Sequence, residues 1–220
     1  MKINVVSKIL EANERIAAEN RRLFDSTGTL AINIMSAPGA GKTSLLRQTI
    51  TQLKGDIKIA VIEGDIQGTY DAEQIGSLGV PVVQINTGGA CHLDASMISE
   101  ALEQLDLDGI DVLIIENVGN LVCPAEFNVG EHMKVMLLSL SEGHDKPLKY
   151  PLMFQESKAL IINKIDLRPH IDADPEKIMK DSLSLNPSLK IFEVSCKTGE
   201  GIAQWTGWLK ETLGRHRKDS

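Results

Sequence analysis

The stretch Ser36-Ala37-Pro38-Gly39-Ala40-Gly41-Lys42-Thr43 follows an aliphatic run, Ala31–Met35, and precedes a helical pattern. Glycines at such a junction leave the backbone amides open to phosphate oxygens, and the helix N-terminus adds a positive dipole end. Lys42 is placed to reach the β and γ phosphates, and the Thr43 hydroxyl to ligate Mg²⁺. Ser36 stands where the usual pattern begins with glycine, whereas the Gly-x-Gly-Lys-Thr end is intact. A plain tight turn is the alternative, but this placement favours a phosphate-binding loop. Nucleotide contacts are expected from Pro38, Gly39, Ala40, Gly41, Lys42, Thr43 and Ser44.

Short aliphatic runs recur after this loop and alternate with helical patterns. Most are continuously apolar, which is typical of strands covered on both faces in a parallel sheet. Because parallel strands need crossover connections, the sequence predicts a three-layer α/β fold of the P-loop NTPase type. Its central sheet should be mainly parallel, with helices on both faces. Besides Ala31–Met35, the expected strands are Ile57–Ile62, Val80–Ile85, Val112–Ile115, Val135–Leu140, Ala159–Ile162 and Lys190–Val194.

The first 24 residues have the pattern of an amphipathic helix. The apolar pairs Ile9-Leu10, Ile16-Ala17 and Leu23-Phe24 recur at seven-residue spacing, and turn-forming residues follow at positions 25–28. We expect this helix to pack on its own domain; a docking helix for a partner protein is the alternative. The sequence predicts a single domain over residues 1–220. It divides into an N-terminal helix and turn at 1–28, the nucleotide-binding part at 29–214 and a solvated tail at 215–220.

The composition narrows the possible partners and compartments. A formal net charge of −7 argues against broad nucleic-acid binding, which needs basic surface. No apolar run approaches the roughly 18 residues that would cross a bilayer, and no membrane association is expected. The N-terminus lacks the apolar core of a signal peptide, so we expect a cytoplasmic protein. In that compartment, the three cysteines are better read as free thiols or metal ligands than as disulfides.

Two acidic residues stand where aliphatic runs end. Asp65 follows the run that ends at Ile62, and Glu116 follows Val112–Ile115. Ligands of open α/β sheets lie beyond the carboxyl ends of the strands, and Mg²⁺ prefers oxygen donors. We therefore expect Thr43, Asp65 and Glu116 to hold Mg²⁺, directly or through water; helix caps or turn carboxylates are the alternative. The residues expected to serve hydrolysis are Lys42, Asp65, Glu116 and Gly119, the last through its backbone amide. Asp71 is left open between a helix cap and a water-positioning group.

A second pair of motifs predicts which base is bound. Asn163-Lys164-Ile165-Asp166 follows one aliphatic run, and Ser195-Cys196-Lys197-Thr198-Gly199 follows the last. A carboxylate at Asp166 can accept two N–H bonds from guanine, a pair of donors that adenine does not offer. Asn163 is expected to tie this loop to the phosphate loop, and the Lys164 stem to lie over the ring. The backbone amides of Ser195 and Cys196 are expected near the guanine oxygen, with Lys197 stacked on the base.

The order of these motifs resembles the dimerising SIMIBI class of P-loop GTPases. The closest resemblance is to the HypB family, the nickel-incorporation GTPases of hydrogenase maturation. It covers the chain from about Leu30 to the last helix, and Ser36 is a variant that this family tolerates. The resemblance implies GTP-promoted homodimers and nickel delivery. It rests on Ser36–Thr43, Glu63-Gly64-Asp65, Asp71-Ala72-Glu73, residues 89–95, Glu116–Pro124, Asn163–Asp166 and residues 195–201.

Cys91, His92 and Cys123 form the candidate metal site. Thiolate and imidazole suit Ni²⁺ and Zn²⁺. We expect adjacent side chains such as Cys91 and His92 to diverge, so that a two-fold dimer completes an intersubunit site. Buried structural cysteines are the alternative. Cys196 is assigned to the base loop. Some relatives carry a cysteine motif or histidine-rich run near the N-terminus, and residues 1–30 contain neither residue type.

The resemblance implies a metallochaperone that converts GTP and water to GDP and phosphate. Hydrolysis would be coupled to nickel insertion into a [NiFe]-hydrogenase precursor. The implied partners are a nickel-chaperone protein and the hydrogenase large-subunit precursor. The alternatives are a urease-type nickel GTPase, a cobalamin-enzyme chaperone GTPase, and a regulatory GTPase switch whose cysteines are structural.

Overall fold

A computed structural model describes residues 5–66 and 68–219; the first four residues of the expected N-terminal helix lie outside this range. The described residues form a seven-stranded sheet of order β3-β2-β4-β1-β5-β6-β7. Each neighbouring pair is parallel. All seven predicted runs overlap a strand. The strands are β1 (Leu30–Ser36), β2 (Ile59–Asp65), β3 (Val82–Asn86), β4 (Val112–Glu116), β5 (Met133–Ser139), β6 (Ser157–Asn163) and β7 (Lys190–Glu193).

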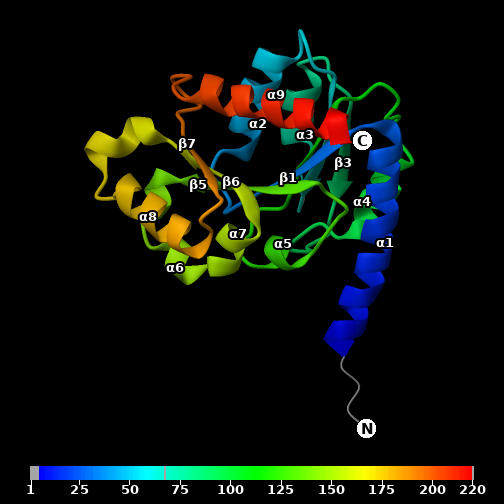
Figure 1. Cartoon of the computed structure of the whole chain (residues 1–220), viewed down its shortest axis with the longest axis horizontal. Helices are drawn as coiled ribbons and strands as arrows, with labels where there is room; N and C mark the ends of the chain where they lie inside the picture. Colours follow the sequence, from blue (N-terminus) through cyan, green and yellow to red (C-terminus); the bar gives the residue numbers. More distant parts are fainter. Residues whose placement is uncertain (1–4, 67, 220) are drawn as a thin grey trace.

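Helices cover both faces of the sheet, as predicted (Figure 1). One face is covered by α2 (Lys42–Leu53), α3 (Tyr70–Gly76) and α9 (Ile202–Asp219). The other is covered by α1 (Val5–Thr27), α4 (Ala95–Leu102), α5 (Cys123–Glu126), α6 (Lys146–Lys149), α7 (Pro151–Gln155) and α8 (Pro175–Leu185). Two 3-10 turns complete the described elements, η1 (Leu140–Glu142) and η2 (Ile165–His170).

Several strands run further than their aliphatic cores, into polar residues. β2 continues through Glu63 to Asp65, β4 ends on Glu116 and β6 ends on Asn163. All these residues stand at carboxyl ends of parallel strands, which share one edge of the sheet. The polar ends therefore gather at the edge where the phosphate loop leaves β1.

The N-terminal helix α1 buries a different stripe from the one its apolar pairs predict. Asn13, Ala17, Asn20 and Phe24 are buried, whereas Leu23 is 42% exposed. Neighbouring residues point about 100° apart on a helix, so one member of each pair turns away from the sheet. The prediction for the side chain of Ile9 is not tested, because burial is described only from Leu10 onward.

The predicted solvated tail forms the last turn of α9, which is helical through Asp219, and its Arg215, Arg217 and Lys218 are exposed. Arg217 forms an ion pair with Asp111, and the His216 ring lies 4.4 Å from that of His132. These contacts join an exposed helix end to the rest of the domain. None of the described helices is both long and apolar enough to cross a membrane.

Candidate functional site

The phosphate loop joins β1 to α2 in a conformation that depends on glycine. Gly41 has φ 103°, and a Cβ there would lie 2.5 Å from the Asn163 amide nitrogen. Lys42 Nζ donates a 3.2 Å hydrogen bond to Ser36 Oγ. The serine in the first loop position therefore supplies a hydroxyl that orients Lys42. A 270 Å³ cavity lies against the loop, lined by Gly39, Gly41, Lys42, Thr43, Ser44, Asp71, Gln74 and Glu116.

Three carboxylates converge beside this loop. Oxygens of Glu63, Asp71 and Glu116 all lie within 4.8 Å of one another. Thr43 Oγ1 donates to Glu116 Oε1 at 3.2 Å. The remaining Oε2 atoms of Glu63 and Glu116 are buried and have no hydrogen-bond partner among the described residues. Unpaired buried carboxylate oxygens beside a hydroxyl fit a divalent cation with oxygen ligands.

Asp65, predicted to serve Mg²⁺ directly or through water, is not one of these three clustered carboxylates, although its charge helps to raise the pKa of Glu63 and Glu116. Its Oδ1 accepts a 2.6 Å hydrogen bond from the Ile66 amide, in the loop after β2. Glu63 takes its place because β2 and β4 pair in register with Glu63 opposite Glu116. The sequence carried a signal for Glu63 that was missed: an acidic residue inside an otherwise apolar strand.

Burial makes these carboxyl groups reluctant to ionise. It raises the pKa of Glu63 to about 8, aided by the negative charges of Glu116 and Asp65. Burial also raises the pKa of Glu116 to about 7, against the opposing charge of Lys42. A divalent cation would favour the ionised forms of both groups.

Gly119 packs directly on the phosphate loop. A Cβ at this position would lie 2.9 Å from the Cα and backbone nitrogen of Pro38. Only a glycine allows this approach without displacing one of the two segments. The loop after β4 is thus in direct contact with the phosphate loop.

The predicted base motifs meet in a second cavity of 310 Å³. It is adjacent to the phosphate cavity, because Gly41 and Ser44 line both. Asn163 Nδ2 donates to Ala40 O at 2.9 Å, which confirms the expected tie to the phosphate loop. Asp166 Oδ1 accepts from Ser195 Oγ at 2.6 Å, so the carboxylate is held by the second motif. The residues lining this cavity are Gly41, Ser44, Asn163, Lys164, Asp166, Leu167, Cys196 and Lys197.

Two details of the base site differ from expectation. The Ser195 amide donates to Glu200 O at 2.9 Å, and the Cys196 amide donates to Asn163 Oδ1 at 3.2 Å. Both amides are therefore engaged within the protein rather than free for a guanine oxygen. Lys164 has φ 62° and donates from Nζ to Gly39 O at 2.7 Å, which places its stem across the mouth of the loop.

The thiol cluster of Cys91, His92 and Cys123 forms within a single chain. Their candidate ligand atoms all lie within 4.8 Å of one another. Cys91 Sγ is 3.2 Å from Cys123 Sγ and 3.6 Å from His92 Nδ1. The expectation that Cys91 and His92 diverge was wrong, because the turn after β3 directs both toward α5. One chain thus offers three N and S donors, a set suited to Ni²⁺ or Zn²⁺.

The surroundings of the thiol cluster affect its ionisation. Burial lowers the pKa of His92, which favours the neutral imidazole that binds metals. The hydrogen bond with Cys91 and burial together raise the pKa of Cys123. Cys196 stands apart: burial raises its pKa to about 11, and the Gln48 side chain donates to its backbone oxygen. Its thiol is a neutral packing group, as expected.

Comparisons with known proteins agree with this geometry. Residues 30–193 match the family described as CobW/HypB/UreG, nucleotide-binding domain. The chain is 48% identical over 213 residues to hydrogenase maturation factor HypB of Azotobacter chroococcum, covering 96% of this chain and 70% of that protein. It is 43% identical to the probable hydrogenase maturation factor HypB of Methanocaldococcus jannaschii, covering 96% of both.

A solved structure gives the same result in three dimensions. The crystal structure of HypB from Helicobacter pylori in complex with nickel superimposes with a TM-score of 0.89 at 40% identity. The match covers 94% of this chain and 97% of that one. The chain therefore belongs to the HypB family of hydrogenase maturation factors.

Proposed function

We propose that this protein is a GTP hydrolase that couples its nucleotide state to nickel insertion into a [NiFe]-hydrogenase precursor. One observation carries the proposal: the nucleotide cavities and the thiol cluster are joined by one short segment, Glu116–Cys123. Glu116 accepts from the phosphate-loop residue Thr43, and Cys123 lies 3.2 Å from Cys91. A change at the phosphates therefore has a direct covalent route to a metal ligand.

Hydrolysis would use groups already aimed at the phosphate cavity. Lys42 would leave Ser36 Oγ for the β and γ phosphates, and the Gly119 amide would contact the γ phosphate. Thr43, Glu63, Asp71 and Glu116 would hold Mg²⁺, which when bound neutralises charge developing on the phosphates. The close approach of Gly119 to Pro38 would report loss of the γ phosphate to the Glu116–Cys123 segment.

Nickel is the cargo in this scheme. The chain supplies three N and S donors, one fewer than a four-coordinate site needs. A second copy related by a two-fold axis would supply the missing donors, so we propose a GTP-promoted homodimer with Ni²⁺ or Zn²⁺ at its interface. Hydrolysis would loosen the Glu116–Cys123 segment, alter the Cys91–Cys123 spacing and release the metal.

The partners follow from this role. They are a nickel-supplying protein and a hydrogenase large-subunit precursor, met in the cytoplasm, with residues 1–220 working as one unit. Delivery to a urease precursor is a second candidate. A relative from Helicobacter hepaticus, 42% identical over 213 residues, bears the name hydrogenase/urease maturation factor HypB.

Guanine selection can be tested at Asp166. The Asp166→Asn variant would present an amide donor where guanine needs acceptors, so preference should shift from GTP to xanthosine triphosphate by about 100-fold or more. Competition binding with both nucleotides measures the shift. Lys197→Ala, at the same cavity, should weaken both nucleotides alike. Retained GTP preference in the Asp166 variant would contradict the role given to this carboxylate.

A further inference from the structure

A chain of buried polar side chains begins at Asn117, the residue directly after Glu116. Its Oδ1 accepts 3.0 Å hydrogen bonds from the amides of Leu93 and Val118. Leu93 follows His92, so this one side chain anchors a metal-ligand loop to the segment after β4. The Leu93 side chain is fully buried and packs directly against Gly64. The contact is so close that a Cβ added to Gly64 would lie 2.7 Å from the Leu93 side chain. The Cys91-His92 loop therefore has little freedom to move independently of Asn117.

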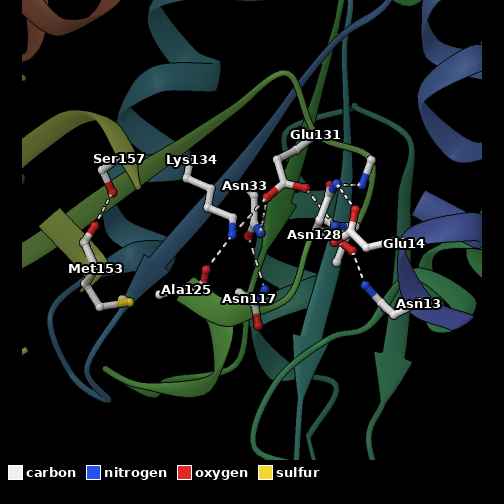
Figure 2. Close-up of polar contacts among 12 residues, drawn as sticks. Asn13, Glu14, Asn33, Asn117, Ala125, Asn128, Glu131, Lys134, Met153 and Ser157 are labelled. Carbon is white, nitrogen blue, oxygen red and sulfur yellow. Dashed lines mark hydrogen bonds and ion pairs between the residues drawn. The ribbon is translucent and has the colours of Figure 1, made fainter. Parts of the chain in front are cut away.

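The series of hydrogen-bonded polar side chains continues through the centre of the sheet. Asn117 Nδ2 donates to Asn33 Oδ1 at 3.1 Å, and Asn33 Nδ2 donates to Glu131 Oε1 at 3.3 Å. Both asparagines are completely buried: Asn33 lies within the otherwise mostly aliphatic β1, and Asn117 directly follows β4. Glu131 Oε2 accepts from the Val129 amide at 2.7 Å. Figure 2 shows Asn33 between Asn117 and Glu131, with no other side chain drawn across the gap.

Lys134 closes the chain on the second metal-ligand segment. Its Nζ lies 3.8 Å from Glu131 Oε1 and donates a 2.7 Å hydrogen bond to Ala125 O (Figure 2). Ala125 belongs to α5, the short helix that begins at Cys123. Lys134 is the second residue of β5, and the pairing of β5 with β6 is irregular between Lys134 and Val135. The polar chain thus starts at one ligand loop and ends on the helix of the other thiol.

We infer that Asn33, Asn117, Glu131 and Lys134 are positioning residues that make the spacing of Cys91 and Cys123 depend on nucleotide state. We call these four residues the polar relay. A movement of Glu116 carries Asn117 with it, which shifts the Leu93 anchor and, through Asn33 and Glu131, the Lys134 contact to α5. The inference rests on the proposed function, because it names the residues through which nucleotide state reaches the metal ligands.

The burial of Asn33, Asn117 and Glu131 is what gives the polar relay this property. In a low-dielectric interior an unpaired polar group is costly, so the members move together or exchange partners completely. An aliphatic core at the same positions would deform gradually and would not link the two loops by directed bonds. The relay therefore behaves as an element with discrete arrangements, which transmission between two sites requires.

The test measures Ni²⁺ affinity of the full chain with GDP and with a non-hydrolysable GTP analogue, and takes their ratio. Asn33→Ala interrupts the relay at its centre and leaves the Leu93–Asn117 and Lys134–Ala125 contacts in place. Lys134→Met removes the last contact and keeps the side-chain length. Asn186→Ala is the matched control, because Asn186 is a buried amide that donates to Phe154 O, Gln155 O and Ser157 O, outside both sites.

If the relay acts as inferred, Asn33→Ala and Lys134→Met should each bring the two Ni²⁺ affinities, with GDP and with the GTP analogue, at least about 2-fold closer to each other than in the wild type. Asn186→Ala should keep the wild-type ratio of the two affinities. If Asn33→Ala fails to fold, Lys134→Met decides the result. A wild-type ratio that persists in both relay variants overturns this inference and leaves the proposed function standing. A ratio of 1 in the wild type overturns the nucleotide-coupled carrier and the relay together.

Discussion

Glu63 shows how a single residue can set the chemistry of the phosphate site. Its carboxylate is buried against Glu116 and Asp71, and burial raises its pKa to about 8. At pH 7 the free protein therefore keeps this group mostly protonated. Because Mg²⁺ needs the ionised form, the cation competes with a proton for the same oxygen.

The Glu63→Gln variant tests this competition. In the wild type, Mg²⁺ binding should tighten as pH rises from about 6 to 8, with release of about one proton per ion at pH 7. The glutamine variant should bind Mg²⁺ at least about 10-fold more weakly, a loss of about 1.4 kcal/mol, with less proton release. Titration calorimetry in two buffers of different ionisation enthalpy measures both quantities.

Asp65→Asn is the control for that experiment. Asp65 lies outside the carboxylate cluster and accepts a bond from its own loop, so this variant should keep Mg²⁺ affinity within about 2-fold. The opposite result, weakened Mg²⁺ binding in Asp65→Asn and normal Mg²⁺ binding in Glu63→Gln, would contradict the role given to Glu63. It would favour Asp65 as the Mg²⁺ ligand, as the sequence predicted.

The roles of site residues that belong to sequence motifs could be predicted. The roles of residues that meet only through the pairing register of neighbouring strands could not. Asn163 and Asp166 occupy the expected places because their partners, Ala40 and Ser195, belong to motifs that the sequence also revealed. Glu63 was missed because its role depends on the pairing of β2 with β4, which no local pattern specifies. The engaged amides of Ser195 and Cys196 were missed for a similar reason, since their acceptors lie on other loops or later in the chain.

At the scale of elements, α1 is held by amide side chains as well as by apolar contact. Asn20 Nδ2 donates to Ala95 O at 2.9 Å and to Val129 O at 3.1 Å, and all three residues are buried. Asn13 similarly donates to Asn128 O and accepts from the Ala95 amide. The helix is thereby docked to the N-terminus of α4, just after the thiol cluster.

Asn20→Ala should lower the free energy of unfolding by about 2–3 kcal/mol, because it removes two hydrogen bonds between buried groups, to Ala95 O and Val129 O. Leu23→Ala, three residues along the same helix, should change it by less than about 0.5 kcal/mol, since Leu23 is largely exposed. Urea denaturation of both variants measures the difference. Equal losses would mean that the apolar pairs, not the buried amides, dock the helix.

The loop after β4 makes a second prediction at this scale. Gly119→Ala would push a Cβ to 2.9 Å from the Pro38 backbone and displace the loop from the phosphate cavity. GTP hydrolysis should fall at least about 10-fold, whereas GDP, which lacks the γ phosphate, should bind almost normally. A phosphate-release assay measures the rate of GTP hydrolysis, and a GDP titration measures the affinity for GDP. Gly207→Ala, at a helical position with no atom within 4 Å of the added Cβ, should leave both unchanged.

The sequence predicted the positions of strands and helices better than it predicted which side of a helix is buried. All seven strands were placed, since continuous apolar runs report burial on both sides. The buried stripe of α1 was only half predicted, because two of its four members are asparagines whose partners lie more than 70 residues away. The exposure of the charged last turn of α9 agrees with the sequence, but neither its helical conformation nor the contact of Arg217 with Asp111 was predicted.

At the scale of the whole molecule, the fold brings a nucleotide site and a thiol cluster to one edge of the sheet. The carboxyl ends of β1, β2, β4 and β6 supply the nucleotide residues, and the turns after β3 and β4 supply the thiols. Convergence of Cys91 with Cys123, 32 positions apart, follows from the sheet order rather than from spacing. That is why the sequence could nominate these ligands but could not show that one chain gathers all three.

Ni²⁺ titration in the presence of GDP and of a non-hydrolysable GTP analogue tests the central claim most directly. The wild-type protein should bind Ni²⁺ with affinities that differ at least about 5-fold between the two nucleotides. Cys91→Ala and Cys123→Ala should each weaken binding at least about 10-fold, while Cys196→Ala, which removes a half-buried thiol outside the cluster, should not. Equal affinities with both nucleotides, unchanged in both cluster variants, would contradict a nucleotide-controlled nickel carrier.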